Sequence, residues 1–130
     1  MPKPETINAI VFYVEDSRST EEFYSRIGFA VTKAGKGHIR ITLDAIELEF
    51  HDERAESIPE FILEAGRRPK GAGIYFYFRV PELELFHQSL INNGVAVKSG
   101  ITERPWGNLE IIVSDPDGYN LVFYQKKVSI

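Results

Sequence analysis

Three side chains that could bind a metal ion or move a proton alternate along one short segment. Glu47, Glu49 and His51 are separated by Leu48 and Phe50. Because successive side chains of a β-strand point to opposite faces, the three would share one face. Carboxylates and imidazoles are ligands of divalent cations and can act as acids and bases. Side chains two residues apart on a strand stand roughly 6–7 Å apart, too far for one ion without ligands from elsewhere. A metal site here is therefore the weaker interpretation.

The remaining histidines offer no further site by their spacing. His38 begins a predicted strand beside a turn. His87 lies on a predicted helix, on the side opposite Leu83, Phe86 and Leu90. We expect both histidines at the surface.

Composition excludes several classes of function. The chain has 130 residues, a net charge of -4 and no basic run, so nucleic acid is not an expected partner. It has no cysteine, which excludes disulfides and thiolate zinc sites. No stretch approaches the roughly 18 apolar residues of a membrane helix. Because Met1–Glu5 also lacks the apolar core of a signal peptide, we expect a cytoplasmic protein that does not act on membranes.

An internal repeat organises the chain. Residues 10–28 and 76–94 share one pattern at an offset of 66: a strand ending in valine, a polar helix, then a glycine. Val14 corresponds to Val80, and Gly28 corresponds to Gly94. A repeat of this size indicates one supersecondary unit used twice. Two copies of a curved sheet would leave a groove in which chemistry or binding could take place.

The pattern of each half predicts one helix and four strands. Asp16 provides a helix-capping side chain and Gly28 ends that helix, while Pro81 begins the corresponding second helix. Ser57–Glu60 could form a capping box that opens a short helix between the halves. We expect strands at residues 6–14, 29–33, 38–43, 45–51, 74–80, 95–98, 109–114 and 119–126.

These elements predict an α+β fold in a single domain spanning residues 1–130. Its two βαβββ modules cover about residues 6–51 and 72–127, and residues 52–71 connect them. We expect the modules to form a U-shaped mixed sheet with the helices outside. The connection is long enough for the modules to pair within one chain or between two chains.

This arrangement resembles the vicinal oxygen chelate superfamily, which includes glyoxalase I, extradiol dioxygenases and the fosfomycin- and bleomycin-resistance proteins. The resemblance spans nearly the whole chain. It rests on the segments 14–16, 19–24, 27–29, 105–107, 115–119 and 122–123, in that order and at that spacing. In that superfamily two βαβββ modules form a U-shaped sheet and dimers are common. Because the fold hosts several chemistries, residues at the site must decide the function.

The resemblance locates four positions that hold a divalent ion in the enzymes of the family. Here they are Ala9, Glu47, Tyr75 and Val122. Alanine and valine cannot coordinate, and a neutral tyrosine is a poor ligand, so one carboxylate would have to hold the ion alone. We therefore expect no metal and no cofactor. An alternative is an ion relocated to Glu47, Glu49 or His51.

The resemblance also places an aromatic surface with carboxylates and one guanidinium along the groove. Aromatic walls bind flat, apolar or cationic groups, and Glu47 and Glu49 would favour a cation. A structural alternative for Tyr75 and Tyr77 is that they fill the interior of the sheet. The predicted groove residues from the strands are Tyr13, Glu47, Glu49, Tyr75, Tyr77, Arg79 and Tyr124.

Two further candidates come from the segment before the last hairpin. Trp106 is the only tryptophan and lies between Pro105 and Gly107. In bleomycin-resistance proteins a Trp-Gly pair in this region lies beside the binding groove at the dimer interface. Glu110 matches an acidic position that follows this pair, and it could face the groove or form an ion pair with Arg104.

The bleomycin-resistance-like branch fits these residues best. It implies a metal-independent protein that binds an aromatic or cationic small molecule in a groove at a homodimer interface, with no catalytic residue. The alternative is a metal-dependent lyase or isomerase of the glyoxalase type with Glu47 as ligand or base. A third possibility is an interaction module whose groove is filled.

Overall fold

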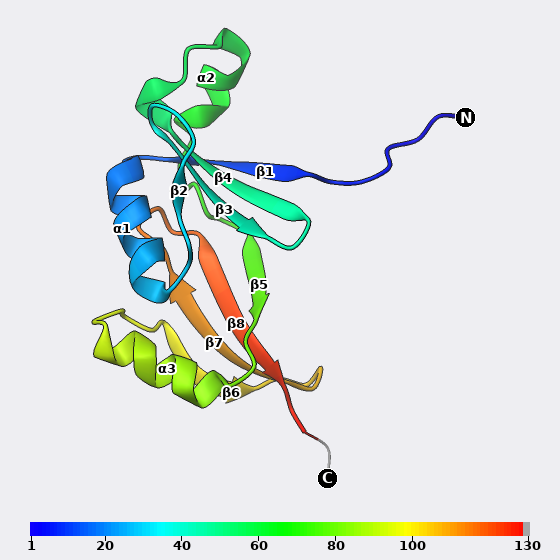
Figure 1. Ribbon diagram of the computed structural model, residues 1–130, viewed down its shortest axis with the longest axis vertical. Helices are drawn as coiled ribbons and strands as arrows, with labels where there is room; N and C mark the ends of the chain where they lie inside the picture. Colours follow the sequence, from blue (N-terminus) through cyan, green and yellow to red (C-terminus); the bar gives the residue numbers. More distant parts are fainter. Residues whose placement is uncertain (129–130) are drawn as a thin grey trace. The chain divides into compact units, whose positions relative to one another are not determined.

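The structure is a computed structural model that describes residues 1–128 and consists of two compact units, Met1–Arg68 and Pro69–Ile130 (Figure 1). We describe each unit by itself. Within the described residues, no helix combines the length and the apolarity needed to cross a membrane.

Unit 1 is a four-stranded mixed sheet with a helix on one face. Its sheet has the order β1-β4-β3-β2, with β1 parallel to β4 and the other pairs antiparallel. The long helix α1 packs on β3 and β4, and Tyr24 of α1 lies 4.8 Å from Phe50 between ring centroids. The elements are β1 (Ala9–Val14), α1 (Ser17–Ile27), β2 (Thr32–Lys33), β3 (His38–Leu43), β4 (Ile46–Asp52), a 3-10 turn (Glu53–Ala55) and α2 (Pro59–Ala65).

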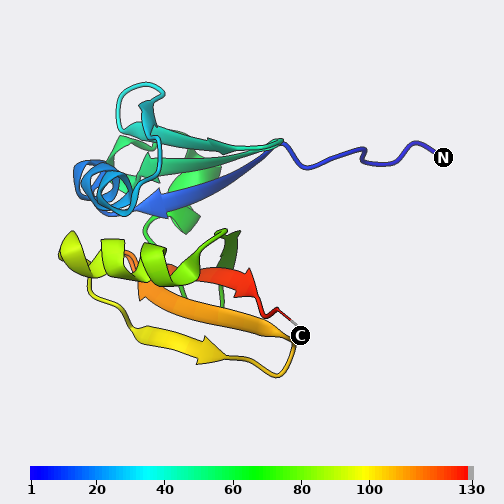
Figure 2. The same ribbon diagram turned by 60° about the horizontal axis from the view of Figure 1, so that its bottom comes forward.

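Unit 2 repeats this plan. Its sheet has the order β5-β8-β7-β6, again with a parallel first pair, and α3 lies across one face (Figure 2). Phe86 of α3 lies 4.6 Å from Phe123 of β8 between ring centroids. The elements are β5 (Tyr75–Arg79), α3 (Leu83–Asn92), β6 (Ser99–Glu103), β7 (Asn108–Ser114) and β8 (Asn120–Lys126).

The register confirms the repeat and the α+β fold of two βαβββ modules. Ala9 lies opposite Glu47, and Tyr75, which is 66 residues after Ala9, lies opposite Asn120. The first helix also follows its predicted ends. Asp16 caps α1 by accepting from the backbone N–H of Arg18 at 3.0 Å, and Gly28 ends α1 at a φ of 118°, which favours glycine.

Three sequence-based expectations about the connecting segments were wrong. In each case, residues predicted to begin a strand or to form a capping box instead take part in a different hydrogen-bond pattern at the end of a helix. Val95 does not begin a strand: it is buried and its N–H bonds to the carbonyl of Leu90 at the end of α3, so β6 begins only at Ser99. Phe29 likewise donates to Tyr24 at the end of α1, which shortens β2 to Thr32–Lys33.

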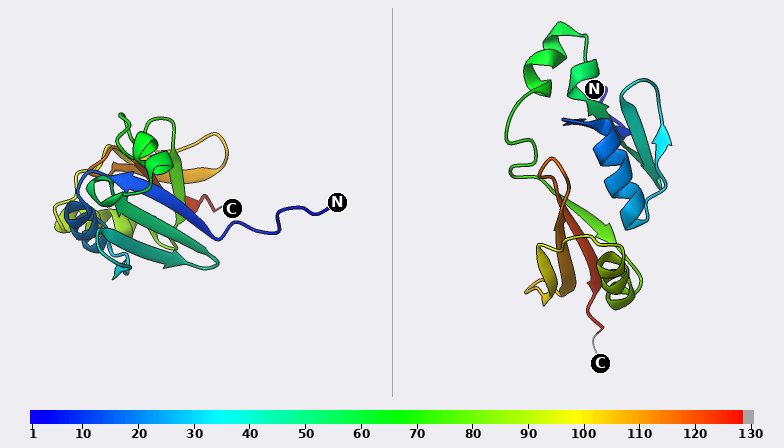
Figure 3. Two further views of the ribbon diagram at one scale, coloured as in Figure 1. Left: turned by 90° about the horizontal axis from the view of Figure 1, so that it is seen from above. Right: turned by 90° about the vertical axis from the view of Figure 1, so that its left-hand side faces the viewer.

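The third expectation concerns α2. The predicted capping box at Ser57–Glu60 does not form, because the N-cap of α2 is Ile58, which makes no side-chain capping bond. The Glu56 carboxylate instead accepts from the N–H groups of Ser57 and Ile58. In Figures 1 and 3, α2 lies past the end of the unit 1 sheet rather than against its face. This position leaves much of its apolar surface exposed, at Ile58, Phe61, Ile62 and Leu63.

Candidate functional site

Each sheet has a second face, which does not carry its helix, and the predicted site residues lie there. In unit 1 we call this the charged face, and it comprises Tyr13, His38, Arg40, Glu47, Glu49 and His51. In unit 2 we call it the aromatic face, and it comprises Tyr75, Tyr77, Arg79, Glu110, Tyr124 and, from the β6–β7 loop, Trp106. All nine predicted residues are on these two faces.

The carboxylates of the charged face are already paired with cations or donors. Arg40 lies between them, with Nε 3.4 Å from Glu47 Oε2 and Nη2 3.8 Å from Glu49 Oε2. His51 Nε2 lies 3.2 Å from Glu49 Oε1, and this hydrogen bond is the main cause that lowers the pKa of Glu49. An arginine this close disfavours both a metal cation and a basic role for Glu47.

The tyrosine and histidines of the charged face are also engaged. The Tyr13 hydroxyl donates to Glu56 Oε1, and burial together with this bond raises the pKa of Tyr13 to about 12. His38 stacks flat on His51, with ring centroids 3.8 Å apart and planes 4° apart. Burial, and next the neighbouring His51, lower the pKa of His38. His38 is partly exposed, and one side of its ring packs on His51.

The aromatic face is more open. Tyr75 is 56% exposed, Tyr77 is 49% exposed, and Trp106 is 61% exposed. Tyr77 and Tyr124 lie on adjacent strands with ring centroids 5.9 Å apart. Val122 of β8, which lies opposite Tyr77, is buried. The structural alternative, in which Tyr75 and Tyr77 fill the interior of the sheet, is therefore wrong.

A buried carboxylate holds the tryptophan in place. Glu110 is 1% exposed, and its Oε2 accepts from the Trp106 indole N–H at 2.7 Å and from the Asn108 amide at 3.2 Å. Arg104 Nε lies 3.4 Å from the other oxygen, Oε1. The same carboxylate contributes to the raised pKa of Tyr77, after burial of that phenol. Trp106 is thus exposed to solvent but anchored through its N–H.

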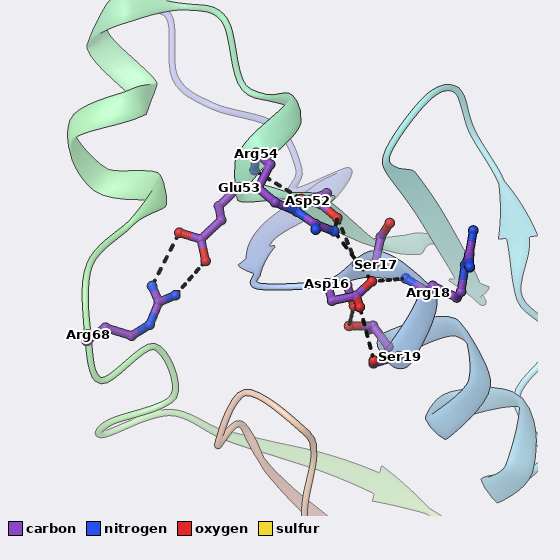
Figure 4. Close-up of polar contacts among 9 residues, drawn as sticks. Asp16, Ser17, Arg18, Ser19, Asp52, Glu53, Arg54 and Arg68 are labelled. Atoms are coloured by element: carbon purple, nitrogen blue, oxygen red, sulfur yellow. Dashed lines mark hydrogen bonds and ion pairs between the residues drawn. The ribbon is translucent and has the colours of Figure 1, made fainter.

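Sequence reasoning missed one polar cluster, centred on Asp52 at the end of β4 (Figure 4). Its buried carboxylate accepts from the backbone N–H of Ser17, at the start of α1, at 3.0 Å. It also accepts from the backbone N–H and the guanidinium of Arg54, and these bonds hold the pKa of Asp52 well below its usual range. The signal in the sequence that could have revealed this cluster is an acidic residue directly after the predicted strand at residues 45–51. The cluster fixes α1 to the sheet and is structural.

The residues at the family's metal positions do not suit a divalent ion. The side chains of Ala9 and Val122 have no donor atoms, and that of Tyr75 is a phenol. By register, the counterpart of Glu47 in the second module is Asn120 rather than Val122. If Asn120 replaces Val122 as the fourth metal position, Glu47 is still the only carboxylate among the four. Within residues 1–128, no group of three acidic or histidine side chains is arranged to hold a metal ion.

Comparison with solved structures gives the same fold. An integron cassette protein from the mobile metagenome of V. cholerae has a TM-score of 0.74 at 21% identity, covering 95% of this chain and 97% of that one. A virulence protein from Salmonella typhimurium has a TM-score of 0.74 at 21% identity, covering 96% and 99%. A bleomycin-binding protein in complex with bleomycin has a TM-score of 0.67 at 21% identity, covering 95% and 100%.

Sequence comparison identifies the family. No curated protein matches the sequence. The family model that matches covers residues 6–123, which is most of the chain, and its description is the Glyoxalase/Bleomycin resistance protein/Dioxygenase superfamily. The chain belongs to this superfamily.

Proposed function

We propose that the protein is a metal-independent binding protein for a small molecule with a flat aromatic group. The observation that supports this most directly is the exposure of Tyr75, Tyr77 and Trp106 together on the aromatic face. Aromatic side chains bury large areas against flat ligands and add edge or stacking contacts. Exposed clusters of this kind mark ligand or partner surfaces.

The anchoring of Trp106 supports the same proposal. A side chain that is already oriented loses little conformational freedom when a ligand binds, so more of the contact energy contributes to affinity. The bond to Glu110 orients the indole before any ligand arrives. A surface tryptophan with only a packing role would not need a buried carboxylate beneath it.

The charged face is less suited to a cationic ligand than the sequence indicated. Glu47 and Glu49 share Arg40, and Glu49 also binds His51, so a cation would have to displace these partners. We therefore assign the aromatic part of the predicted ligand the larger share of the affinity. Tyr13, Glu47 and Glu49 remain proposed as secondary lining residues. The bleomycin complex of a similarly folded protein supports small-molecule binding on this fold without naming the ligand here.

We also propose a homodimer whose partner subunit completes the groove, working in the cytoplasm. The edge strands β1 and β5, and the exposed apolar residues of α2, are surfaces that a second copy would cover. Light scattering at micromolar concentration should give twice the chain mass of 14.8 kDa. A monomer mass would contradict the dimer.

Calorimetric titration with 2-naphthol, a flat and mainly neutral aromatic, tests the binding proposal. We expect saturable binding to the metal-free protein, and roughly tenfold weaker binding after Tyr77→Leu, because ring contacts of this kind contribute about 1 kcal/mol or more. Ile91→Ala is the control, since Ile91 is a comparably exposed apolar residue on α3, which lies on the other face of the unit 2 sheet. Absence of heat at millimolar ligand, or equal losses in both variants, would contradict the proposal.

A further inference from the structure

Arg79 is an exposed arginine without a partner among the described residues. It ends β5, and its guanidinium makes no hydrogen bond or ion pair within residues 1–128. The other arginines beside the two candidate faces are paired: Arg40 with Glu47 and Glu49, and Arg104 with Glu110. Arg79 is thus the guanidinium at these faces that is available to a ligand.

The position of Arg79 connects it with the aromatic rings. Tyr75, Tyr77 and Arg79 alternate along β5, so they share one side of the strand at intervals of roughly 6–7 Å. Across the sheet, Arg79 lies opposite Tyr124, whose ring is adjacent to that of Tyr77. A fused aromatic ring resting on Tyr77 and Tyr124 would place a substituent on its edge within reach of the guanidinium.

The charge around Arg79 favours an anion. Glu110 is the only carboxylate on this side of the unit 2 sheet within residues 69–128, and it is buried and bonded to Arg104, Trp106 and Asn108. It is therefore not available to neutralise Arg79. Lys126, on the same side of β8, adds a further positive charge.

We propose that Arg79 selects ligands that carry a carboxylate on the aromatic group, so that the ligand is an aromatic acid. The planar guanidinium donates two parallel hydrogen bonds to a carboxylate, while the tyrosine rings hold the flat part. This inference rests on the proposed function and specifies its ligand class. It reverses the cationic preference that Glu47 and Glu49 alone would indicate.

Calorimetric titration with three ligands of one shape tests the inference: 2-naphthoate, its neutral amide 2-naphthamide, and the cation 2-naphthylmethylammonium. Wild-type protein should bind the carboxylate about tenfold more tightly than the amide, the size expected for a charge-assisted hydrogen bond. The cation should bind weakest. Arg79→Gln should remove the preference and leave the affinity for the amide unchanged, and Arg79→Lys should restore part of it.

Arg18→Gln is the matched control, since Arg18 is exposed on α1 and its guanidinium makes no ion pair within residues 1–128. This variant should keep the full preference for the carboxylate. If the amide or the cation binds as tightly as the carboxylate, or if Arg79→Gln keeps the preference, the inference is wrong while the aromatic binding function stands. If none of the three ligands binds, both are wrong.

Discussion

The two modules share one backbone plan but use the helix-free face of the sheet in opposite ways. On the charged face of unit 1, ionic groups are paired with each other: Arg40 forms ion pairs with two glutamates, and Glu49 pairs with His51. On the aromatic face of unit 2, tyrosine rings and Arg79 remain exposed. A repeated fold therefore does not imply a repeated site.

Matched positions make the contrast specific. His51 lies between Tyr13 and His38 in the unit 1 sheet, and Tyr124 lies between Arg79 and Glu110 at the same place in unit 2. A stacked histidine pair in one module thus corresponds to a tyrosine beside a buried carboxylate in the other. We infer that the first module is specialised for internal pairing and the second for binding.

The largest expected difference between the modules is at the start of their helices. Asp52 accepts from the N–H of Ser17, and Gln125 accepts from the N–H of Leu83 at the matched position, at 2.8 Å. Asp52→Ala should lower the free energy of unfolding by about 3 kcal/mol, because it removes the hydrogen bonds of a buried carboxylate to both Ser17 and Arg54. Gln125→Ala removes one neutral bond and should cost about 1 kcal/mol. Urea unfolding measures both, and equal losses would refute the contrast.

The same unfolding curves test the proposal that residues 1–130 form a single cooperative domain. A single domain predicts one transition whose midpoint moves as a whole in the Asp52→Ala variant. Two transitions, of which only one responds to Asp52→Ala, would show that the compact units unfold independently.

Glu110→Gln should have the next largest effect. The amide can present its oxygen either to Trp106 or to Arg104, but not to both, so one donor faces an NH2 group. We expect a loss of about 2 kcal/mol in the free energy of unfolding and a changed indole N–H resonance of Trp106. The control is Glu103→Gln, whose exposed carboxylate pairs with Lys127 and should contribute little. An unchanged indole resonance in Glu110→Gln would argue against the anchor.

The smallest expected effect is a pH dependence of the charged face. Because the pKa of His38 is lowered in the folded protein, the unfolded chain binds more protons than the folded one below the usual histidine pKa of about 6.5. Stability should therefore fall as the pH drops from about 7 towards the pKa of His38 in the folded protein. His51, Glu49 and Glu56 are the titratable groups that act on it. His38→Asn should flatten this part of the curve, and an unchanged slope would contradict the assignment.

The sequence predicted what depends on local pattern. The repeat predicted that the first strand of each module ends in valine: β1 ends at Val14 as predicted, whereas β5 ends at Arg79, one residue before Val80. Strand alternation placed Tyr75 and Tyr77 on one face, as the structure confirms. Turn and cap residues such as Asp16 and Gly28 set the ends of α1 correctly. These features depend on backbone preference and on burial of one side of each element.

Pairing between side chains on different strands could not be predicted. Whether Glu110 would face a ligand or pair with Arg104 depends on the register of β6 and β7 and on the loop between them, and the sequence left both alternatives open. The hydrogen bond from Trp106 to Glu110 was not predicted. The neutralisation of Glu47 by Arg40 likewise requires the β3–β4 register. Motif spacing likewise assigned the fourth metal position to Val122, whereas the strand register places Asn120 opposite Tyr75.

Chemical-shift mapping of the nitrogen-15-labelled protein with 2-naphthol tests the central claim most directly, because it reports each face separately. The account predicts the largest shifts at Tyr75, Tyr77 and the Trp106 indole N–H, with smaller shifts at Glu47 and Glu49. Shifts confined to the charged face of unit 1, or no shifts at saturating ligand, would contradict the assignment of binding to the aromatic face.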